Sequence, residues 1–288
     1  MKGQALAVPH SSGTAPPKLE APAKTADCHI HIYDKRYASS GHVVDNSTVA
    51  EYRMLQKRIG FERVVIVTPR CYGTDNTVTV DAIRELGIDN ARGVGVLRPD
   101  VSDADLKQLN DGGIRGIRFT VGDPKTAVVS IDMIEPLARR IAAYGWHIQL
   151  NMPCDKIVEH ADMLRRLPTP VVFDHLGKPP EEEGIKHPSH TVIRGMLDSR
   201  RAWVKISGAY MNTRVGPPTY ADATAVAQAF VKANPERLVW GSDWPHPSPK
   251  VPPDDALLFD LLTTWVPDAA TRQRILVENP QALYGFPM

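Results

Sequence analysis

Two histidines near the start of the chain and one aspartate near its end are the residues best suited to chemistry. His29 and His31 alternate within the apolar run 25–33. Asp243 ends the apolar run 238–243. On a β-strand the side chains at positions i and i+2 share a face, so the two imidazoles point the same way, and Cys28 and Ile30 point the other way. Imidazoles and carboxylates move protons and hold metal ions, so the pattern predicts a site wherever these two strands lie side by side.

Eight short apolar runs alternate with longer amphipathic segments, an order typical of strand–helix units around a parallel sheet. The predicted strands are residues 25–33, 64–69, 93–98, 114–120, 147–152, 170–176, 203–208 and 238–243. The predicted helices include residues 49–59, 77–86, 131–144, 156–166, 220–233 and 254–264. We expect an α/β fold closed as a single (β/α)8 barrel of TIM type, because closure makes the first and last strands neighbours. An open doubly wound sheet would keep them apart, and no Gly-rich dinucleotide motif follows any strand.

Composition predicts one soluble barrel domain preceded by a short arm. Residues 1–24, rich in Ala, Pro, Ser, Thr and Lys, are expected to form a flexible arm that lies on the barrel or on a neighbouring subunit, and residues 25–288 to form the barrel. A net charge of +1 without a dense Lys/Arg run argues against nucleic acid as a partner. No apolar run approaches the roughly 20 residues that span a membrane. Cys28, Cys71 and Cys154 lack a CxxC motif, which favours reduced thiols and a cytoplasmic location. A homo-oligomer stays open.

Hydrogen-bonding side chains follow every predicted strand except the third, and we expect them to surround one pocket at the carboxyl ends of the strands. Beyond the residues above they are Thr68, Cys71, Tyr72, Thr74, Asn76, Arg118, Thr120, Gln149, Asn151, Asp174, His175, Lys178, Ser207, Tyr210, Arg214 and His246. Asp27 and Asp174 precede site histidines and are expected to face the opposite side of their strands as structural partners. Two alternatives stay open: Arg118 binds substrate or anchors against Asp174, and His246 acts in the site or caps its loop.

Five short motifs stand at the ends of the predicted strands. They are residues 27–31 (DCHIH), 73–76 (GTDN), 115–119 (RGIRF), 173–179 (FDHLGKP) and 240–247 (WGSDWPHP). In this order and spacing the chain resembles the amidohydrolase superfamily and, within it, the 2-pyrone-4,6-dicarboxylate hydrolase group of lactonases, over residues 25–286. The resemblance implies a barrel enzyme that opens a lactone ring.

Many members of that superfamily hold one or two divalent ions with the strand-one HxH pair, a group from strand four or five, the strand-six histidine and the strand-eight aspartate. Here the fifth strand has no Lys, Glu or His at its carboxyl end, and Arg118 of the fourth cannot bind a cation because it stays protonated. A single ion such as zinc could still use His29, His31 and Asp243. The resembling lactonases work without a metal, so we expect no cofactor.

The expected reaction is hydrolysis of a small carboxylated lactone of the 2-pyrone-4,6-dicarboxylate, muconolactone or sugar-acid type, in aromatic-compound degradation or sugar-acid metabolism. Asp243 is assigned as the base, with His29, His31 and His175 positioning water and polarising the carbonyl. The candidates for substrate binding are the cations Arg118, Arg214 and Lys178 and the neutral residues Tyr72, Thr74, Asn76, Asn151 and Tyr210. The rivals are a lactone isomerase, a zinc-dependent decarboxylase of the same superfamily and a non-catalytic binding barrel.

Overall fold

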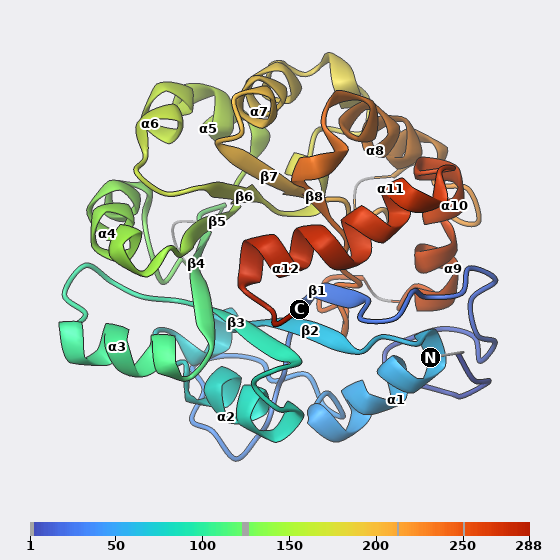
Figure 1. Cartoon of the computed structure of the whole chain (residues 1–288), viewed down its shortest axis with the longest axis horizontal. Coiled ribbons are helices and arrows are strands. Elements are labelled where there is room, and N and C mark those ends of the chain that lie inside the picture. The colour runs from blue at the N-terminus through green and yellow to red at the C-terminus, as the bar shows by residue number, and fades with distance from the viewer. Residues whose placement is uncertain (1–2, 123–126, 212, 250) are drawn as a thin grey trace.

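Eight parallel strands follow one another in chain order around the centre of the molecule (Figure 1). The computed structural model describes residues 3–122, 127–211, 213–249 and 251–288. The strands are β1 (Ala26–Ile30), β2 (Arg63–Val67), β3 (Ala91–Gly95), β4 (Ile114–Thr120), β5 (His147–Asn151), β6 (Val171–Phe173), β7 (Ala202–Lys205) and β8 (Leu238–Val239). Each strand pairs in parallel with the next, from β1 and β2 to β7 and β8. All eight overlap the predicted runs.

The chain beyond β8 returns to β1 and brings the two ends of the sheet together. The Asp243 N–H donates to the His29 carbonyl oxygen at 2.8 Å, and the His31 N–H donates to that of Trp244, also at 2.8 Å. Ile30 and Trp244 form a parallel bridge. These contacts make the first and last strands neighbours, as the barrel prediction requires, and the predicted (β/α)8 architecture is confirmed.

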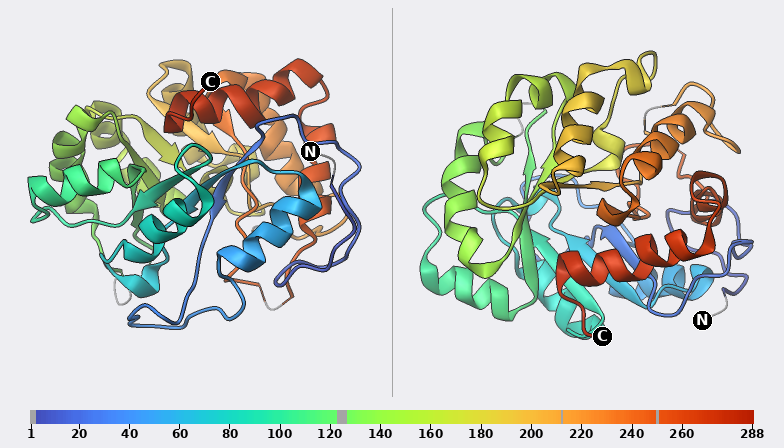
Figure 2. Two further views of the ribbon diagram at one scale, coloured as in Figure 1. Left: turned by 60° about the horizontal axis from the view of Figure 1, so that its bottom comes forward. Right: turned by 45° about the horizontal axis from the view of Figure 1, so that its top comes forward.

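Helices cover the outside of the barrel (Figures 1 and 2). They are α1 (Val49–Ile59), α2 (Thr77–Leu86), α3 (Asp103–Asp111), α4 (Ile134–Ile141), α5 (Cys154–Glu159), α6 (Ala161–Arg166), α7 (Pro188–Asp198), α8 (Ala221–Ala233), α9 (Asp255–Asp260), α10 (Leu262–Trp265), α11 (Ala269–Gln273) and α12 (Asn279–Tyr284). Two predicted helices are broken. The segment 156–166 divides at His160, which caps both α5 and α6, and the segment 254–264 divides into α9 and α10.

An apolar cluster fills the barrel interior below the site. Its members are Ala26, Cys28, Val65, Val67, Val94, Val172, Trp203, Val239, Tyr284 and Phe286. The guanidinium groups of Arg63 and Arg92, on β2 and β3, each lie 5.2 Å from the centre of the Phe286 ring. The segment after α12 therefore closes the amino-terminal end of the barrel and leaves the opposite end for chemistry.

The register of β1 shifts between Asp27 and Ile30. Cys28 was expected on the face away from the site, yet it packs in the inner cluster. A bulge of this kind re-aims side chains relative to strict alternation, and it leaves His29 and His31 both buried in the barrel.

Residues 3–24 lie against the barrel, beside α1 and the segment that leads into α9 (Figure 2). Arg58 of α1 joins the arm to the segment before α9. Its guanidinium donates to the carbonyl oxygen of Ala15 and the hydroxyl of Ser11, both at 3.0 Å, and pairs with Asp254 at 2.5 Å. The flexibility of this arm and the boundary at residue 24 stay predictions. Among the described residues, no helix is both long and apolar enough to cross a membrane.

Candidate active site

One carboxylate and three imidazoles meet at the carboxyl end of the barrel. Asp243 Oδ1 lies 3.4 Å from His29 Nε2, 3.7 Å from His31 Nε2 and 3.7 Å from His175 Nε2. The Nε2 atoms of His29 and His31 are 3.4 Å apart. All four side chains are buried, with residue exposures between 0 and 4%. The structure therefore brings together the four residues that the sequence singled out for catalysis.

Tight backbone geometry holds this cluster. Asp243 and His175 each follow a strand with a positive φ, 67° and 47°, which turns their side chains into the barrel mouth. A Cβ at position 241 would lie 2.7 Å from the backbone nitrogen of His29, so only glycine lets β8 approach β1 this closely. A Cβ at Gly208 would likewise lie 3.0 Å from His175 Nδ1.

The charges in the cluster are set by burial and by mutual contacts. Burial alone would raise the pKa of Asp243, but His175, His29, His31 and a hydrogen bond from Tyr210 hold it below its usual range. Burial, together with the charge of Arg118, lowers the pKa of His31 to about 4. Burial also lowers the pKa of His29 and His175. At neutral pH the site thus presents an ionised carboxylate facing three neutral imidazoles.

The second ring nitrogens decide what each neutral imidazole can do. His31 Nδ1 lies 2.8 Å from the Val67 carbonyl oxygen and must donate to it, which leaves Nε2 as an acceptor facing the site. His29 Nδ1 lies 3.3 Å from the Nζ of Lys205, whose amine also donates to the Cys28 carbonyl oxygen at 2.8 Å. A lysine that donates to Nδ1 places the His29 proton on Nε2, whereas donation from Nδ1 to Asp174 Oδ1, 3.4 Å away, makes Nε2 an acceptor. With the lysine as donor, His31 and His29 offer one acceptor and one donor to the same small volume.

Lys205 is a site residue that the sequence interpretation missed. It lies on β7, is fully buried, and its Nζ is 3.8 Å from Asp174 Oδ1. Burial lowers its pKa to about 8, against the opposing effect of Asp174. The available signal was a lysine inside the apolar run 203–208, two positions before Ser207 on the inward face.

Asp174 corrects a second expectation, because it faces the site and not the outside of its strand. Its Oδ2 accepts from Arg118 Nε at 2.9 Å and from Gln149 Nε2 at 3.2 Å, and its Oδ1 lies 3.4 Å from His29 Nδ1. The positive φ of His175, the next residue, turns the chain so that both side chains point inward. Arg118 thus anchors against Asp174, one of the two alternatives left open, while it also borders a cavity described below.

The remaining predicted binding residues divide into two groups. Tyr210 reaches the cluster and donates to Asp243 Oδ2 at 2.5 Å, and Lys178 donates to Asn151 Oδ1 at 3.1 Å near the ends of β5 and β6. The others lie elsewhere, held by different partners. The Tyr72 hydroxyl bonds the backbone of Asp34, Asn76 bonds Thr68 and the backbone of Val96, Thr74 is exposed, and Arg214, 62% exposed, pairs with Glu181 and Glu182.

A cavity of about 540 Å3 opens beside the cluster. Its lining comes from the loops after β1, β2, β4 and β8: Tyr33, Ser40, Gly41, His42, Val44, Arg70, Cys71, Ala127, Val128 and Pro247. The ring of Tyr33 is 6.3 Å from that of His31. A narrow extension shares Arg70 and Val128 with it and reaches Arg118 and Thr68. Among the described residues, Arg70 lines both hollows and Arg118 lines the narrow one, while the four cluster residues line neither. Arg70 is a further residue that the sequence interpretation did not single out.

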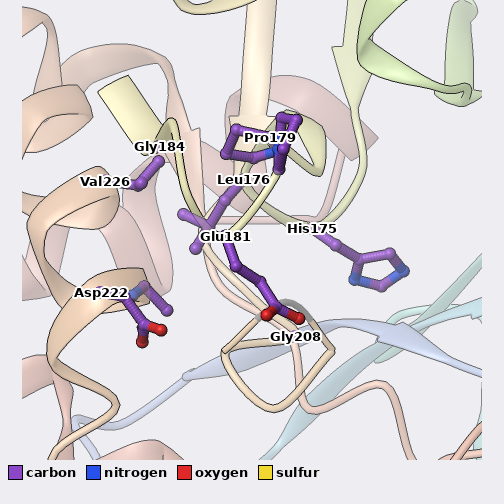
Figure 3. A pocket seen from close by; sticks show the side chains of 10 residues that line it. His175, Leu176, Pro179, Glu181, Gly184, Gly208, Asp222 and Val226 are labelled. Atoms are coloured by element: carbon purple, nitrogen blue, oxygen red, sulfur yellow. Dashed lines mark hydrogen bonds between the residues drawn. The ribbon is translucent and has the colours of Figure 1, made fainter. Parts of the chain in front are cut away.

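A second, much smaller cavity of about 20 Å3 lies behind His175, between the β6 loop and α8. Figure 3 shows the imidazole of His175 pointing away from this cavity, whereas the side chains of Leu176, Glu181 and Val226 gather around it. It has room for little more than one water molecule. The large cavity is the better candidate for a substrate.

The donor atoms of the cluster also match one divalent cation. Separations of 3.4–3.7 Å around Asp243 Oδ1 are close to the roughly 3.3 Å between ligands of a tetrahedral zinc site with bonds of about 2.0 Å. His29, His175 and Asp243 form one compact donor group in the described chain, and Cys154, Asp155 and His187 form another. His175 thus joins the ligand set considered from the sequence. Two groups face His29 Nδ1 with opposite effects on this use. The amine of Lys205, 3.3 Å away, disfavours the Nδ1 proton that a ligating Nε2 needs, whereas Asp174 Oδ1, 3.4 Å away, can accept that proton.

Comparison with known proteins identifies the family. An amidohydrolase family model matches residues 26–286. The chain is 32% identical to a 2-pyrone-4,6-dicarboxylate hydrolase of Comamonas testosteroni, over 93% of this chain and 92% of the relative. It is 30% identical to a 4-sulfomuconolactone hydrolase of Rhizobium radiobacter, over 94% and 93%, and 30% identical to a D-galactarolactone isomerase of Agrobacterium fabrum (strain C58 / ATCC 33970), over 95% and 94%.

A solved structure agrees with these sequence relatives. A probable 2-pyrone-4,6-dicarboxylic acid hydrolase from Acinetobacter baumannii, with citric acid bound, superimposes with a TM-score of 0.79 at 25% identity, covering 91% of this chain and all of that one. The matched family model, the sequence relatives and the barrel with its buried His–Asp cluster lead to one assignment: the chain belongs to the amidohydrolase family, within its group of lactonases.

Proposed function

We propose that this enzyme hydrolyses a small carboxylated lactone by direct attack of water on the ester carbonyl. The observation that carries the proposal is the position of Asp243 Oδ1 within 3.4–3.7 Å of three imidazole nitrogens. A cavity lined by Arg70 and a narrow hollow lined by Arg70 and Arg118 lie nearby. The three sequence relatives reported above are named as enzymes that act on lactones. Ester hydrolysis needs a base for water and donors for the oxyanion, and this cluster contains both.

In the proposed reaction Asp243 takes a proton from a water molecule, and the oxygen of that water forms a bond to the lactone carbonyl carbon. His31 Nε2 accepts the second hydrogen of the water, because its Nδ1 is committed to Val67. His29, which carries its proton on Nε2, donates to the oxyanion. Collapse of the tetrahedral intermediate breaks the ring C–O bond, and the departing oxygen regains the proton from Asp243. The product is a hydroxy acid or its keto tautomer.

The low pKa of Asp243 makes it a weak base, and this selects the substrate. A base works best when its pKa lies near the operating pH. A lactone whose leaving group is an enolate or another stabilised oxygen needs less help than an amide or a simple ester. We therefore expect conjugated or acyl-activated lactones of the pyrone and muconolactone types to react fastest, with sugar-acid lactones slower.

Arg118 and Arg70 are the proposed partners of the substrate carboxylates. Arg118 is 8% exposed and borders the narrow part of the cavity, with Asp174 on its Nε. Its remaining guanidinium nitrogens suit a carboxylate. Arg70 lines both the wide and the narrow part. Lys178 adds a third cation, partly desolvated, beside Asn151.

We further propose that the reaction needs no metal. The support is the amine of Lys205 beside His29 Nδ1, together with Arg118 on the other side of Asp174, since both add positive charge where an ion would sit. If an ion were bound, His29, His31, His175 and Asp243 would hold it, and it would polarise water or the carbonyl oxygen. Elemental analysis of purified protein and assays after dialysis against a chelator test this: full activity without stoichiometric metal supports it, and loss restored by zinc refutes it.

A lactone isomerase is the second candidate, favoured by the similarity to D-galactarolactone isomerase. The same base would then remove a proton from a hydroxyl of the substrate in place of water. Analysis of the product in H2 18O separates the two: hydrolysis places one 18O atom in the carboxylate, whereas isomerisation places none.

The proposal is tested with a panel of pyrone, muconolactone and aldonolactone substrates, followed by proton release. Asp243→Asn keeps the shape of the side chain and should lower kcat by about 10²- to 10⁴-fold, the usual contribution of a general base, in a protein that is still folded by circular dichroism. Turnover of a lactone by the wild type and near-wild-type rates in the variant would remove Asp243 from the mechanism.

We place the enzyme in the cytoplasm, as a protein of small-molecule metabolism. Its three cysteines are free thiols, which suits a reducing compartment. Small carboxylated lactones of aromatic or sugar-acid metabolism are its expected partners, and association into a homo-oligomer stays a prediction.

A further inference from the structure

Three polar side chains extend from Asp243 away from the imidazole cluster: Tyr210, which is partly buried, and His246 and Asp255, which are buried. The Tyr210 hydroxyl donates to Asp243 Oδ2 at 2.5 Å, and His246 Nδ1 lies 3.1 Å from the same hydroxyl oxygen. His246 Nε2 lies 3.1 and 3.2 Å from the two carboxylate oxygens of Asp255. His246 is 4% exposed and Asp255, the first residue of α9, is fully buried. Each member thus lies within hydrogen-bond distance of the next.

This row of side chains contacts the carboxylate oxygen of Asp243 that does not face the imidazoles. Its Oδ1 faces His29, His31 and His175, and its Oδ2 faces Tyr210. A carboxylate fixed at one oxygen cannot rotate freely, so the other oxygen keeps its direction. Burying two polar side chains, His246 and Asp255, is costly compared with an apolar core, which suggests a role beyond packing.

The N-terminal arm contacts the outer end of this row of three side chains. The backbone N–H of Asp255 donates to the Ser11 hydroxyl at 3.2 Å, and the indole N–H of Trp244 donates to the Pro9 carbonyl oxygen at 2.8 Å. The Ser12 N–H also donates to the Pro253 carbonyl oxygen at 2.9 Å. Arm contacts therefore stand on both sides of the segment that carries His246.

We propose that Tyr210, His246 and Asp255 form a positioning relay that aims the catalytic oxygen of Asp243 at the attacking water, and that residues 9–12 of the arm brace this relay from outside. The relay rests on the proposed function of Asp243 as base. None of the three needs to touch the substrate: Asp255 orients His246, His246 orients the Tyr210 hydroxyl, and the hydroxyl orients Asp243. The logic is that of an orienting third residue behind a general base.

The first test compares Tyr210→Phe, His246→Leu and Asp255→Asn with the wild type. Each should lower kcat about 10- to 100-fold, as expected when a reacting group loses its alignment, with KM changed less than threefold. Tyr220→Phe is the matched control, because Tyr220 is another tyrosine of the same β7–α8 connection. Wild-type kcat in His246→Leu and Asp255→Asn overturns the relay.

Paired substitutions separate a relay from three independent structural roles. If the residues act through one another, Tyr210→Phe combined with His246→Leu should be no slower than the worse single variant. Losses that multiply in the double variant contradict the proposal.

A comparison of two variants at one position guards against misfolding. His246→Asn keeps an amide that can reach the Tyr210 hydroxyl, whereas His246→Leu keeps volume without polarity. The relay predicts that Asn retains more activity than Leu, with both folded by circular dichroism. A packing role predicts the reverse order. Ser11→Ala, at the surface of the arm, should lower kcat by severalfold without moving KM, and an unchanged kcat removes the arm from the proposal.

Failure of the relay and failure of the proposed function give different results. If Asp243→Asn is inactive while the relay variants are as active as the wild type, only the relay is wrong. If Asp243→Asn is itself active, Asp243 is not the base and the relay loses its purpose as well.

Discussion

Lys205→Met should make the folded protein more stable and the enzyme slower. Burial lowers the pKa of Lys205 from an ordinary 10.5 to about 8. At about 1.4 kcal/mol per pH unit, charging this amine inside the barrel costs about 3 kcal/mol at pH 7. Methionine removes that cost and loses the hydrogen bond to the Cys28 carbonyl oxygen, worth about 1 kcal/mol. A net gain of about 2 kcal/mol is expected.

The gain should depend on pH with a definite sign. Because the pKa of Lys205 is lower in the folded than in the unfolded chain, the unfolded chain binds more protons between about pH 8 and 10.5. The wild type therefore gains stability as the pH rises through this window, and loses it again as the pH falls toward 8. Between pH 7 and pH 9.5 the advantage of the variant should shrink by about 2 kcal/mol.

Thermal unfolding of the two proteins at both pH values measures this difference. An unfolding entropy of about 2.1 cal/mol/K per residue gives about 0.6 kcal/mol/K for 288 residues, so 2 kcal/mol corresponds to about 3 °C. Lys232→Met, which removes an exposed lysine of α8, serves as the control and should show no such pH-dependent gap. A variant that is several degrees less stable at pH 7, or a gap that stays constant with pH, would refute this reasoning. Lower kcat is expected because His29 loses the donor at Nδ1.

Arg118→Met should raise KM more than tenfold. It should also lower the free energy of unfolding by about 3 to 5 kcal/mol, because it leaves the buried Asp174 without its arginine partner. Kinetics and denaturant unfolding measure the two effects, and an unchanged KM would mean that Arg118 is structural only. Arg214→Met should change KM less than threefold, because that guanidinium is exposed and paired with Glu181 and Glu182; a larger rise in KM would place Arg214 on the substrate. Lowering the pH from 7 to 5 should cost about 2 kcal/mol of stability through His31 alone, since its pKa of about 4 in the folded chain means that the unfolded chain takes up the proton first. Calorimetry should show that His31→Asn lacks this share of the pH dependence. An equal loss of stability between pH 7 and 5 in the wild type and the variant would contradict the assignment.

The strand order and the central cluster could be predicted because they rest on simple patterns. Apolar runs at regular spacing fix the number of βα units, and closure follows once there are eight. His29, His31, His175 and Asp243 all stand at strand ends, where alternation and topology together place them at one rim. The geometry agrees with this expectation.

Residues that depend on local turns or on unusual burial were harder to predict. The side on which Asp174 lies depends on the left-handed backbone at His175, which is uncommon for residues other than glycine and which the sequence pattern does not indicate. Lys205 reads as an ordinary strand lysine, since its burial is visible only once the barrel closes around it. Tyr72 and Asn76 are polar residues of the correct loop, but backbone partners hold them away from the cluster.

Closure between β1 and the chain after β8 ties the chemistry to the last stage of folding. The hydrogen bond from Asp243 to the His29 carbonyl oxygen joins residues at opposite ends of the sequence, and such distant contacts form slowly because loop-closure entropy opposes them. During synthesis the three imidazoles emerge well before the carboxylate. Catalytic competence should therefore be acquired in a single late event, and partly made chains should have none.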